Sequence, residues 1–321
     1  MNTIADLRRI AEGLEPRRVL IPGADRKEDV ELAQSLRDAG LVPHCILVGD
    51  AGRIRQMAES AGLTVADSDI VHSPSQDQTA RLTAEMVEQG RVDVILKGNI
   101  SSPLLNRTLL RLKTRNTISQ VTVFETPYIA AGRPVLFTDS AVTTVCDLER
   151  LSDLVRNAAE VARLAMDIGR PRVALLSANE KVIESLPSSK LAAELTKARW
   201  ENMVVYGPLS FDLAVDPKAV SLKEIPVTAG DPMAEVAGRA DVLVCPGLDS
   251  ANLLYKLVMS LAHHGQASMA SITVGLKVPY VVVSRADPLA NKLNSVALCC
   301  VYDAHVKDPA AKANSAAPET R

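Results

Sequence analysis

Short β-branched apolar runs alternate with longer amphipathic segments along this chain, and the alternation constrains the fold more than any other feature. In the first hundred residues the apolar runs lie at 19–21, 45–48 and 92–96. The amphipathic segments lie at 3–13, 26–39, 51–61 and 75–89, and the last three of them each end at a glycine. Runs this short indicate buried strands, whereas the longer segments have the apolar period of helices. Strands that alternate with helices predict an α/β fold with parallel-rich sheets.

The alternation begins again after a long amphipathic segment at 147–167, which predicts a helix that bridges two halves of the molecule. Further strand-like runs lie at 121–124, 135–137, 173–176, 203–206, 241–245, 270–274 and 278–283. Two more helices are predicted at 188–199 and 251–263. The carboxyl ends of parallel strands meet at one edge of a sheet, so we expect ligand sites in the turns that follow the strands.

The composition excludes several classes of protein. With 321 residues, 47% of them hydrophobic, the chain can bury a large core, and more than one domain is expected. The net charge is −2, so the chain lacks the excess of basic residues that nucleic-acid-binding proteins use to contact phosphates. Only 3% of the residues are aromatic, so few side chains could stack on bases. No apolar run approaches the length of a membrane span, and the N-terminus has no signal-peptide core.

The cysteines and the possible metal ligands add two expectations. The five cysteines form no C-x-x-C pair, which predicts reduced thiols in the core of a cytoplasmic protein. The histidines and acidic residues show no metal-ligand spacing, so no bound metal is expected.

The first candidate site is the turn Ser284-Arg285-Ala286-Asp287, which follows the apolar run 278–283. Asp287 is predicted to be the N-cap of the next helix, with Pro288 at the first helical position. A hydroxyl, a guanidinium and the N–H groups of a helix start would converge there, and together they would hold a phosphate. The alternative is an ordinary helix cap beside a surface arginine.

The second candidate site is the loop Lys97-Gly98-Asn99-Ile100-Ser101-Ser102, which follows the run 92–96. Gly98 lets the chain turn closely, and Ser102 is predicted to cap a helix that has Pro103 at its first position. Lys97 and Arg107, which lies about one turn into that helix, would supply positive charge. The alternative is a plain turn with both cations in solvent.

Eight segments, in this order, resemble the phosphate acetyl/butyryltransferase family over roughly residues 90–301. They are VDVILKGNISSPLLNR, VTVFETP, VLFTDSAV, VALLSANEKV, YGPLSFDLAV, ADVLVCPGLDSANLLYKLV, ITVGLKVPYVVVSRAD and KLNSVAL. The Ser-Arg-Ala-Asp motif followed by Lys-Leu-Asn-Ser is most similar to the butyryl-type branch.

The resemblance implies reversible acyl transfer between coenzyme A and inorganic phosphate, with both as substrates and no bound cofactor. It also implies a homodimer with two α/β domains around a cleft, of the isocitrate/isopropylmalate-dehydrogenase-like kind. Domain I would comprise 1–138 and 289–305, and domain II would comprise 139–288. Residues 306–321 are small, polar and interrupted by proline, a composition that predicts a disordered tail.

The resemblance assigns roles residue by residue. Ser284, Arg285 and Asp287 match catalytic positions: Ser284 and Arg285 match residues that bind phosphate in the family, and Asp287 is the acid/base. Phosphate binding falls to Arg107 and to the loop residues Lys97, Gly98, Ser101 and Ser102. Coenzyme A contacts fall to Asn252, Tyr255 and Lys256, in the motif of the second domain.

The chain departs from the family pattern at three of these motifs. Asn291 stands where acetyl-type members carry an acid, Leu104 where members often have Asp, and Ala251 where they have Gly. Two alternatives follow: a non-catalytic protein that binds coenzyme A or acyl phosphate, and a metal-dependent dehydrogenase of similar fold. The dehydrogenase would need clustered aspartate ligands, which the sequence lacks. Which acyl group is used depends on pocket size, which the sequence does not give.

Overall fold

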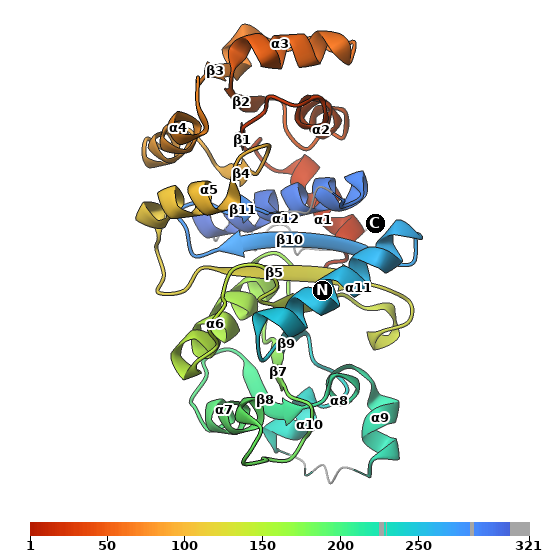
Figure 1. The fold of residues 1–321 in the computed structure, drawn as a ribbon. Coiled ribbons are helices and arrows are strands. Elements are labelled where there is room, and N and C mark those ends of the chain that lie inside the picture. The colour runs from red at the N-terminus through yellow and green to blue at the C-terminus, as the bar shows by residue number, and fades with distance from the viewer. Residues whose placement is uncertain (225–227, 229, 283–285, 309–321) are drawn as a thin grey trace. The chain divides into compact units, whose positions relative to one another are not determined.

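The computed structural model describes residues 1–224, 228, 230–282 and 286–308, and they form two compact units (Figure 1). The terminal unit consists of Leu7–Ile118 and the chain from Ser271 onward, and the central unit consists of Met1–Asp6 and Ser119–Ala270. These units divide the chain at other points than the expected boundaries after residues 138 and 288. The expected boundaries remain a prediction about folding domains, whereas the units describe compactness alone.

The terminal unit holds a mostly parallel set of strands. Its strands are β1 (Val19–Pro22), β2 (Cys45–Gly49), β3 (Ile70–His72), β4 (Val94–Leu96), β10 (Ser268–Val274) and β11 (Tyr280–Val281). They lie in the order β3-β2-β1-β4-β11-β10, and only the β10–β11 pair is antiparallel among the pairs described. The helices are α1 (Ile4–Gly13), α2 (Lys27–Asp38), α3 (Ala51–Ser60), α4 (Gln76–Glu88), α5 (Ser102–Leu109) and α12 (Leu289–Lys307).

The central unit repeats the same architecture. Its strands are β5 (Ser119–Glu125), β6 (Val135–Thr138), β7 (Arg172–Leu176), β8 (Val204–Leu209) and β9 (Val242–Val244), in the order β5-β6-β9-β7-β8. The β5–β6 pair is antiparallel and the other described pairs are parallel. The helices are α6 (Leu148–Leu164), α7 (Pro187–Thr196), α8 (Phe211–Val215), α9 (Pro217–Leu222), α10 (Pro232–Val236) and α11 (Leu248–His263).

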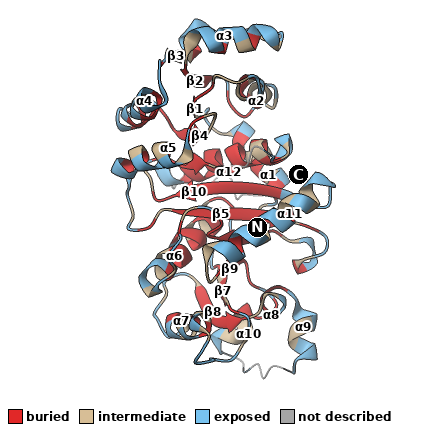
Figure 2. Ribbon diagram, in the orientation of Figure 1, coloured by how far each residue is buried: buried red, intermediate tan, exposed pale blue. Residues whose placement is uncertain are grey.

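Each unit is built around its own hydrophobic core, and Figure 2 shows most of the strands, together with helix α12, in the buried colour. In the terminal unit, side chains such as Leu20, Ile95 and Leu105 form the core beneath α4 and α5. In the central unit, Phe124 and Phe137 meet edge to face, with ring centroids 5.8 Å apart. The α/β fold with mostly parallel strands is therefore confirmed.

Helix α12 is buried on nearly all sides, because it packs against β4, β11 and α2. Two polar contacts fix it along its length. The Nε of Arg8 donates to Asn294 Oδ1 at 2.6 Å, and the backbone N–H of Ser271 donates to Ser295 Oγ at 2.9 Å. These contacts tie α12 both to the beginning of the chain and to β10.

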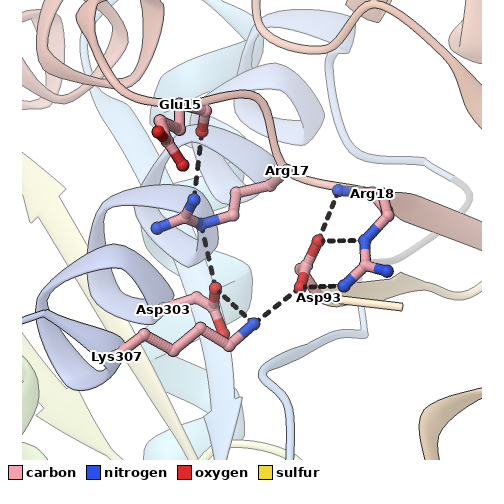
Figure 3. Close-up of polar contacts among 6 residues, drawn as sticks. All are labelled: Glu15, Arg17, Arg18, Asp93, Asp303 and Lys307. Carbon is pink, nitrogen blue, oxygen red and sulfur yellow. Dashed lines mark hydrogen bonds and ion pairs between the residues drawn. The ribbon is translucent and has the colours of Figure 1, made fainter. Parts of the chain in front are cut away.

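An ion network holds the C-terminal end of α12 (Figure 3). The Nε of Arg17 lies 2.9 Å from Asp303 Oδ2, and the Nζ of Lys307 lies 3.0 Å from the same oxygen. Lys307 also reaches Asp93 at 2.6 Å, while Arg18 donates two hydrogen bonds of 2.8 Å to Asp93. Burial would raise the pKa of Asp93, but the hydrogen bonds from Arg18 and Lys307 lower it below its usual range. Burial raises the pKa of Asp303, against the opposing charges of Lys307 and Arg17.

Several expected boundaries were wrong. Helix α12 continues through Lys307, two residues into the stretch expected to be disordered, because Lys307 is held by the ion network; residues 309–321 lie outside the described residues. The strand expected at 278–283 is described only at Tyr280–Val281. Helix α11 begins at Leu248, three residues before the expected start.

The strand expected at 203–206, just ahead of Gly207-Pro208, continues through this pair, which lies inside β8. Strand β8 is at the edge of the sheet order, where a proline costs few ladder hydrogen bonds. The pairing of β7 with β8 shifts register between Ala174 and Leu176, opposite this pair. A local irregularity thus accommodates the proline without ending the strand.

The five cysteines are free, and all but the half-buried Cys146 are buried. Burial raises the pKa of Cys45, Cys245 and Cys300 to about 12. The prediction that these thiols are free and lie in the core is therefore confirmed for these side chains. Within the described residues, no helix is long and apolar enough to cross a membrane.

Candidate functional site

The loop that joins β4 to α5 is locked against the loop that follows β1. A Cβ atom added to Gly98 would lie 2.9 Å from the carbonyl oxygen of Pro22, and one added to Gly23 would lie 2.5 Å from that of Asn99. Gly23 also has a φ of 77°, which favours glycine. The N–H of Asn99 donates to the Gly23 carbonyl at 2.9 Å. Gly98 is therefore needed for a close approach between two backbones.

The structure brings most of the predicted phosphate-binding residues onto this one loop. Lys97 is half-buried and its Nζ donates to the carbonyl oxygen of Gly98 at 3.2 Å. Helix α5 begins at Ser102, so Ser101 and not Ser102 occupies the N-cap position, without a capping hydrogen bond from its side chain. The expected cap was one residue late because Pro103 is tolerated at the second helical position as well as at the first. Arg107 lies exposed in the second turn of α5.

The predicted catalytic turn is described only in part. Ser284 and Arg285 lie outside the described residues. Asp287 is buried, and so is Asn291 in the first turn of α12. Helix α12 begins at Leu289 with Pro288 in the N-cap position, so the expectation that Asp287 caps this helix was wrong. Pro288 has an extended ψ of 146°, which places it ahead of the first helical residue.

A carboxylate in the first turn of α2 lies near the Lys97 loop. Burial raises the pKa of Asp29 to about 6, with smaller contributions from Asp25 and Glu28, while the positive charges of Arg26 and Lys97 oppose the rise. Its Oδ2 atom is buried and has no hydrogen-bond partner among the described residues. A raised carboxyl pKa beside a cation is typical of functional sites. Sequence reasoning missed Asp29 because its surroundings come from the fold.

In the central unit, the start of α11 meets the loop that follows β6. The Nδ2 of Asn252 donates to the carbonyl oxygen of Ser140 at 2.9 Å. Asp139 orders that loop, because its carboxylate accepts the backbone N–H groups of three residues at 2.9–3.1 Å: Ala141, Val142 and Thr143. Burial raises the pKa of Asp139, although these hydrogen bonds oppose the rise.

These two segments enclose a hollow of about 360 Å³. Its lining comprises Ser140, Ala141, Leu248, Asp249, Asn252, Leu253 and Lys256. A second hollow, of about 480 Å³, shares Leu248 and Asp249 and extends along Gly247 and Ser250 at the start of the helix. Asn252 and Lys256 thus face one hollow from successive turns of α11.

Tyr255 takes a different position from its two predicted neighbours. It is buried in the core cluster of the central unit, and the Nζ of Lys256 lies 5.4 Å from the centroid of its ring. Tyr255 therefore makes a cation–π contact with Lys256 and is not one of the residues that line the hollow.

The terminal unit offers a cation, hydroxyl groups and a helix start on one loop, and the central unit offers a hollow with a lysine and an amide. Such features are typical of an α/β protein that binds anionic small molecules. Within the described residues, no group of three or more His, Cys, Asp or Glu side chains could hold a metal ion.

Comparisons with known proteins narrow this class. The family model described as "Phosphate acetyl/butaryl transferase" matches residues 70–300. A phosphate butyryltransferase of Clostridium acetobutylicum is 33% identical over 85% of this chain and 90% of that protein. A phosphate acetyltransferase of Rhizobium meliloti is also 33% identical, over 81% of this chain and 80% of that protein.

A solved structure gives the same result. A branched-chain phosphotransacylase from Enterococcus faecalis V583 superposes with a TM-score of 0.74 at 30% identity, and the match covers 89% of this chain and 99% of that one. The chain belongs to the phosphate acetyl/butyryltransferase family. The resemblance predicted from the eight sequence segments is therefore confirmed, and with it the enzyme class, phosphate acyltransferase.

Proposed function

We propose that this enzyme transfers a short-chain acyl group reversibly between coenzyme A and inorganic phosphate, so that acyl-CoA and phosphate give acyl phosphate and CoA. The observation that carries the proposal is the Lys97–Ser102 loop, which carries a cation and two hydroxyl groups and leads into α5. Helix starts and cations are suited to a phosphate dianion. Family membership supplies the reaction class.

The reaction needs three kinds of group. A phosphate oxygen attacks the thioester carbonyl carbon, and the tetrahedral oxyanion collapses as the carbon–sulfur bond breaks. We assign the holding of phosphate to Lys97, Ser101, Ser102 and Arg107, with Gly98 allowing the loop its shape. Ser284 and Arg285 would help to hold the phosphate and would stabilise the oxyanion. Asp287 would accept the proton of the attacking phosphate and deliver it to the departing sulfur, which leaves as the thiol of coenzyme A.

Coenzyme A would be held in the central unit. The hollow beside α11 combines apolar lining with the amide of Asn252 and the ammonium group of Lys256. Lys256 would pair with a phosphate group of coenzyme A. Tyr255 would keep Lys256 in place through its ring.

A thiol-release assay tests the proposal. Purified enzyme would be mixed with acetyl-, propionyl-, butyryl- and isobutyryl-CoA, with and without phosphate, and free CoA would be titrated. We expect release that depends on phosphate and yields a stoichiometric acyl phosphate. Coenzyme A binding without turnover on any of these thioesters would favour the non-catalytic alternative, to which Asn291 and Ala251 gave rise.

We also propose that the enzyme is a cytoplasmic homodimer. The buried free thiols support a reducing compartment. Leu257 is 57% exposed on α11, and this exposed apolar side chain supports pairing with a second copy. Sedimentation of wild type and of Leu257→Asp tests this, and a wild-type monomer at micromolar concentration would refute it.

A further inference from the structure

The Lys97–Ser102 loop is held from outside by two side chains that belong to other elements of the terminal unit. One is Asp25, in the loop between β1 and α2. The other is Gln76, the first residue of α4. Neither lies near the Lys97–Ser102 loop in the sequence, and each contacts a different residue of it.

Asp25 fixes the middle of the loop. The Nδ2 of Asn99 donates to Asp25 Oδ1 at 3.2 Å, and the other carboxylate oxygen lies 3.7 Å from Nη1 of Arg53. Arg53 belongs to α3, whose own start is capped by Asp50. Asp25 is thus shared between an amide of the loop and a guanidinium on a capped helix. The Asn99 side chain is thereby held on one side of the loop.

Gln76 fixes the end of the loop. Its Oε1 accepts the backbone N–H of Ser101 at 3.1 Å, which would otherwise be an unpaired donor at the start of α5. Pro103 has no N–H to offer. Gln76 therefore pairs the N–H group of Ser101. The N–H groups of Ser102 and Leu104, in the first turn of α5, have no partner within the helix, as at any helix start.

We propose that Asp25 and Gln76 are positioning residues for phosphate, acting through Asn99 and Ser101 to hold the Lys97–Ser102 loop in its binding form. This inference rests on the proposed function. A binding loop needs such supports because its donors must be placed to within about half an ångström. The contact of Gly98 with Pro22 leaves the loop little room to adjust by itself.

The test compares matched variants by steady-state kinetics with phosphate varied. Gln76→Met keeps the bulk of the side chain but removes the acceptor, and Asp25→Ala removes the carboxylate. We expect each to raise the phosphate KM about 10-fold, the value of one hydrogen bond. The acyl-CoA KM should change less than about twofold, because the central unit is untouched. Asp25→Asn keeps an acceptor for Asn99 and should recover most of the loss.

Gln78→Ala is the control, since Gln78 is exposed on the same turn of α4. It should leave all constants unchanged. Melting temperature is followed in parallel, together with its rise on addition of inorganic phosphate, which reports binding without turnover. A variant that folds but turns over poorly should show a smaller rise in melting temperature on addition of phosphate than the wild type does.

Three results would overturn the inference. The phosphate KM could stay within twofold of wild type in both variants. Both KM values could rise and kcat could fall together with the melting temperature, which would show a structural role only. The Asp25→Asn variant could be as impaired as Asp25→Ala. If wild type shows no phosphate-dependent thiol release at all, the proposed function itself fails, a result that is distinguishable from these three.

Discussion

Replacing Asp29 by asparagine should stabilise the protein at neutral pH. The carboxylate lies in the first turn of α2, and burial raises its pKa to about 6. A carboxyl group with a raised pKa binds its proton more tightly in the folded state than in the unfolded state. Its ionisation therefore destabilises the folded state, progressively as the pH rises from about 4 to about 6 and fully above that.

The magnitude follows from the two pKa values. The difference between about 6 and the ordinary 3.8 corresponds to about 3 kcal/mol at pH 7.5. Asparagine loses the favourable interaction of a negative charge with the helix start, which is worth up to about 1 kcal/mol. The net gain expected for Asp29→Asn is thus about 2 kcal/mol, or a rise in melting temperature of several degrees.

The assay is thermal unfolding followed by circular dichroism, from pH 4 to pH 8. The gain should be present at pH 7.5 and nearly absent at pH 4, where Asp29 is protonated in the folded wild type. Glu28→Gln is the control, because Glu28 is exposed in the same turn; it should shift stability by no more than about 0.5 kcal/mol. An equal effect of Asp29→Asn at both pH values, or a destabilisation at pH 7.5, would refute the reasoning.

Four further outcomes are expected. Gly98→Ala should raise the phosphate KM about 10-fold or more, since its Cβ would lie 2.9 Å from the Pro22 carbonyl oxygen. Wild-type kinetics in this variant would show that the two loops can move apart at little cost. Lys256→Ala should raise the KM for acyl-CoA and not for phosphate in steady-state kinetics. A raised phosphate KM with an unchanged acyl-CoA KM would show that coenzyme A does not bind beside Lys256. Arg285→Gln should lose about 3–4 kcal/mol of transition-state stabilisation, with Arg285→Lys recovering part, as kcat/KM will show; wild-type turnover in both variants would remove Arg285 from the site. Lys307→Met should cost about 1–2 kcal/mol in low salt and less in 1 M NaCl, while melting of the exposed control Lys181→Met stays unchanged; a loss that salt does not reduce would contradict an electrostatic role.

The regular elements were predictable from local pattern. The segment 51–61 became Ala51–Ser60 and the segment 75–89 became Gln76–Glu88, because a single apolar period and a closing glycine define such helices. Local pattern failed at Gly207-Pro208, which suggests a turn but lies in edge strand β8. Only the position of a strand in the sheet decides whether a proline is tolerated there.

The candidate site was predictable where it lies in one loop and not where it is assembled from several. Lys97 and Gly98 could be predicted as site residues because they directly follow an apolar run that has the pattern of a strand. Their supports do not, since Asp25 and Asn99 are 74 residues apart in the chain. Tyr255 could have been read differently, because Ala251, Tyr255 and Val258 have the spacing of a buried helical face, and all three are buried.

The discontinuous build of the terminal unit sets the order in which the chain can mature during synthesis. The hydrogen bond from Arg8 to Asn294 joins residues 286 positions apart. At a synthesis rate of about 5–20 residues per second, Asn294 is made roughly 15–60 s after Arg8. Over this interval the segment Ser119–Ala270, nearly all of the central unit, emerges without needing the final helix. The surfaces of β4 and α2 that α12 will cover stay open meanwhile. A chain released before α12 is made would therefore have a nearly complete central unit and a terminal unit with exposed apolar surface. Chaperones would bind such a chain, or proteases would degrade it.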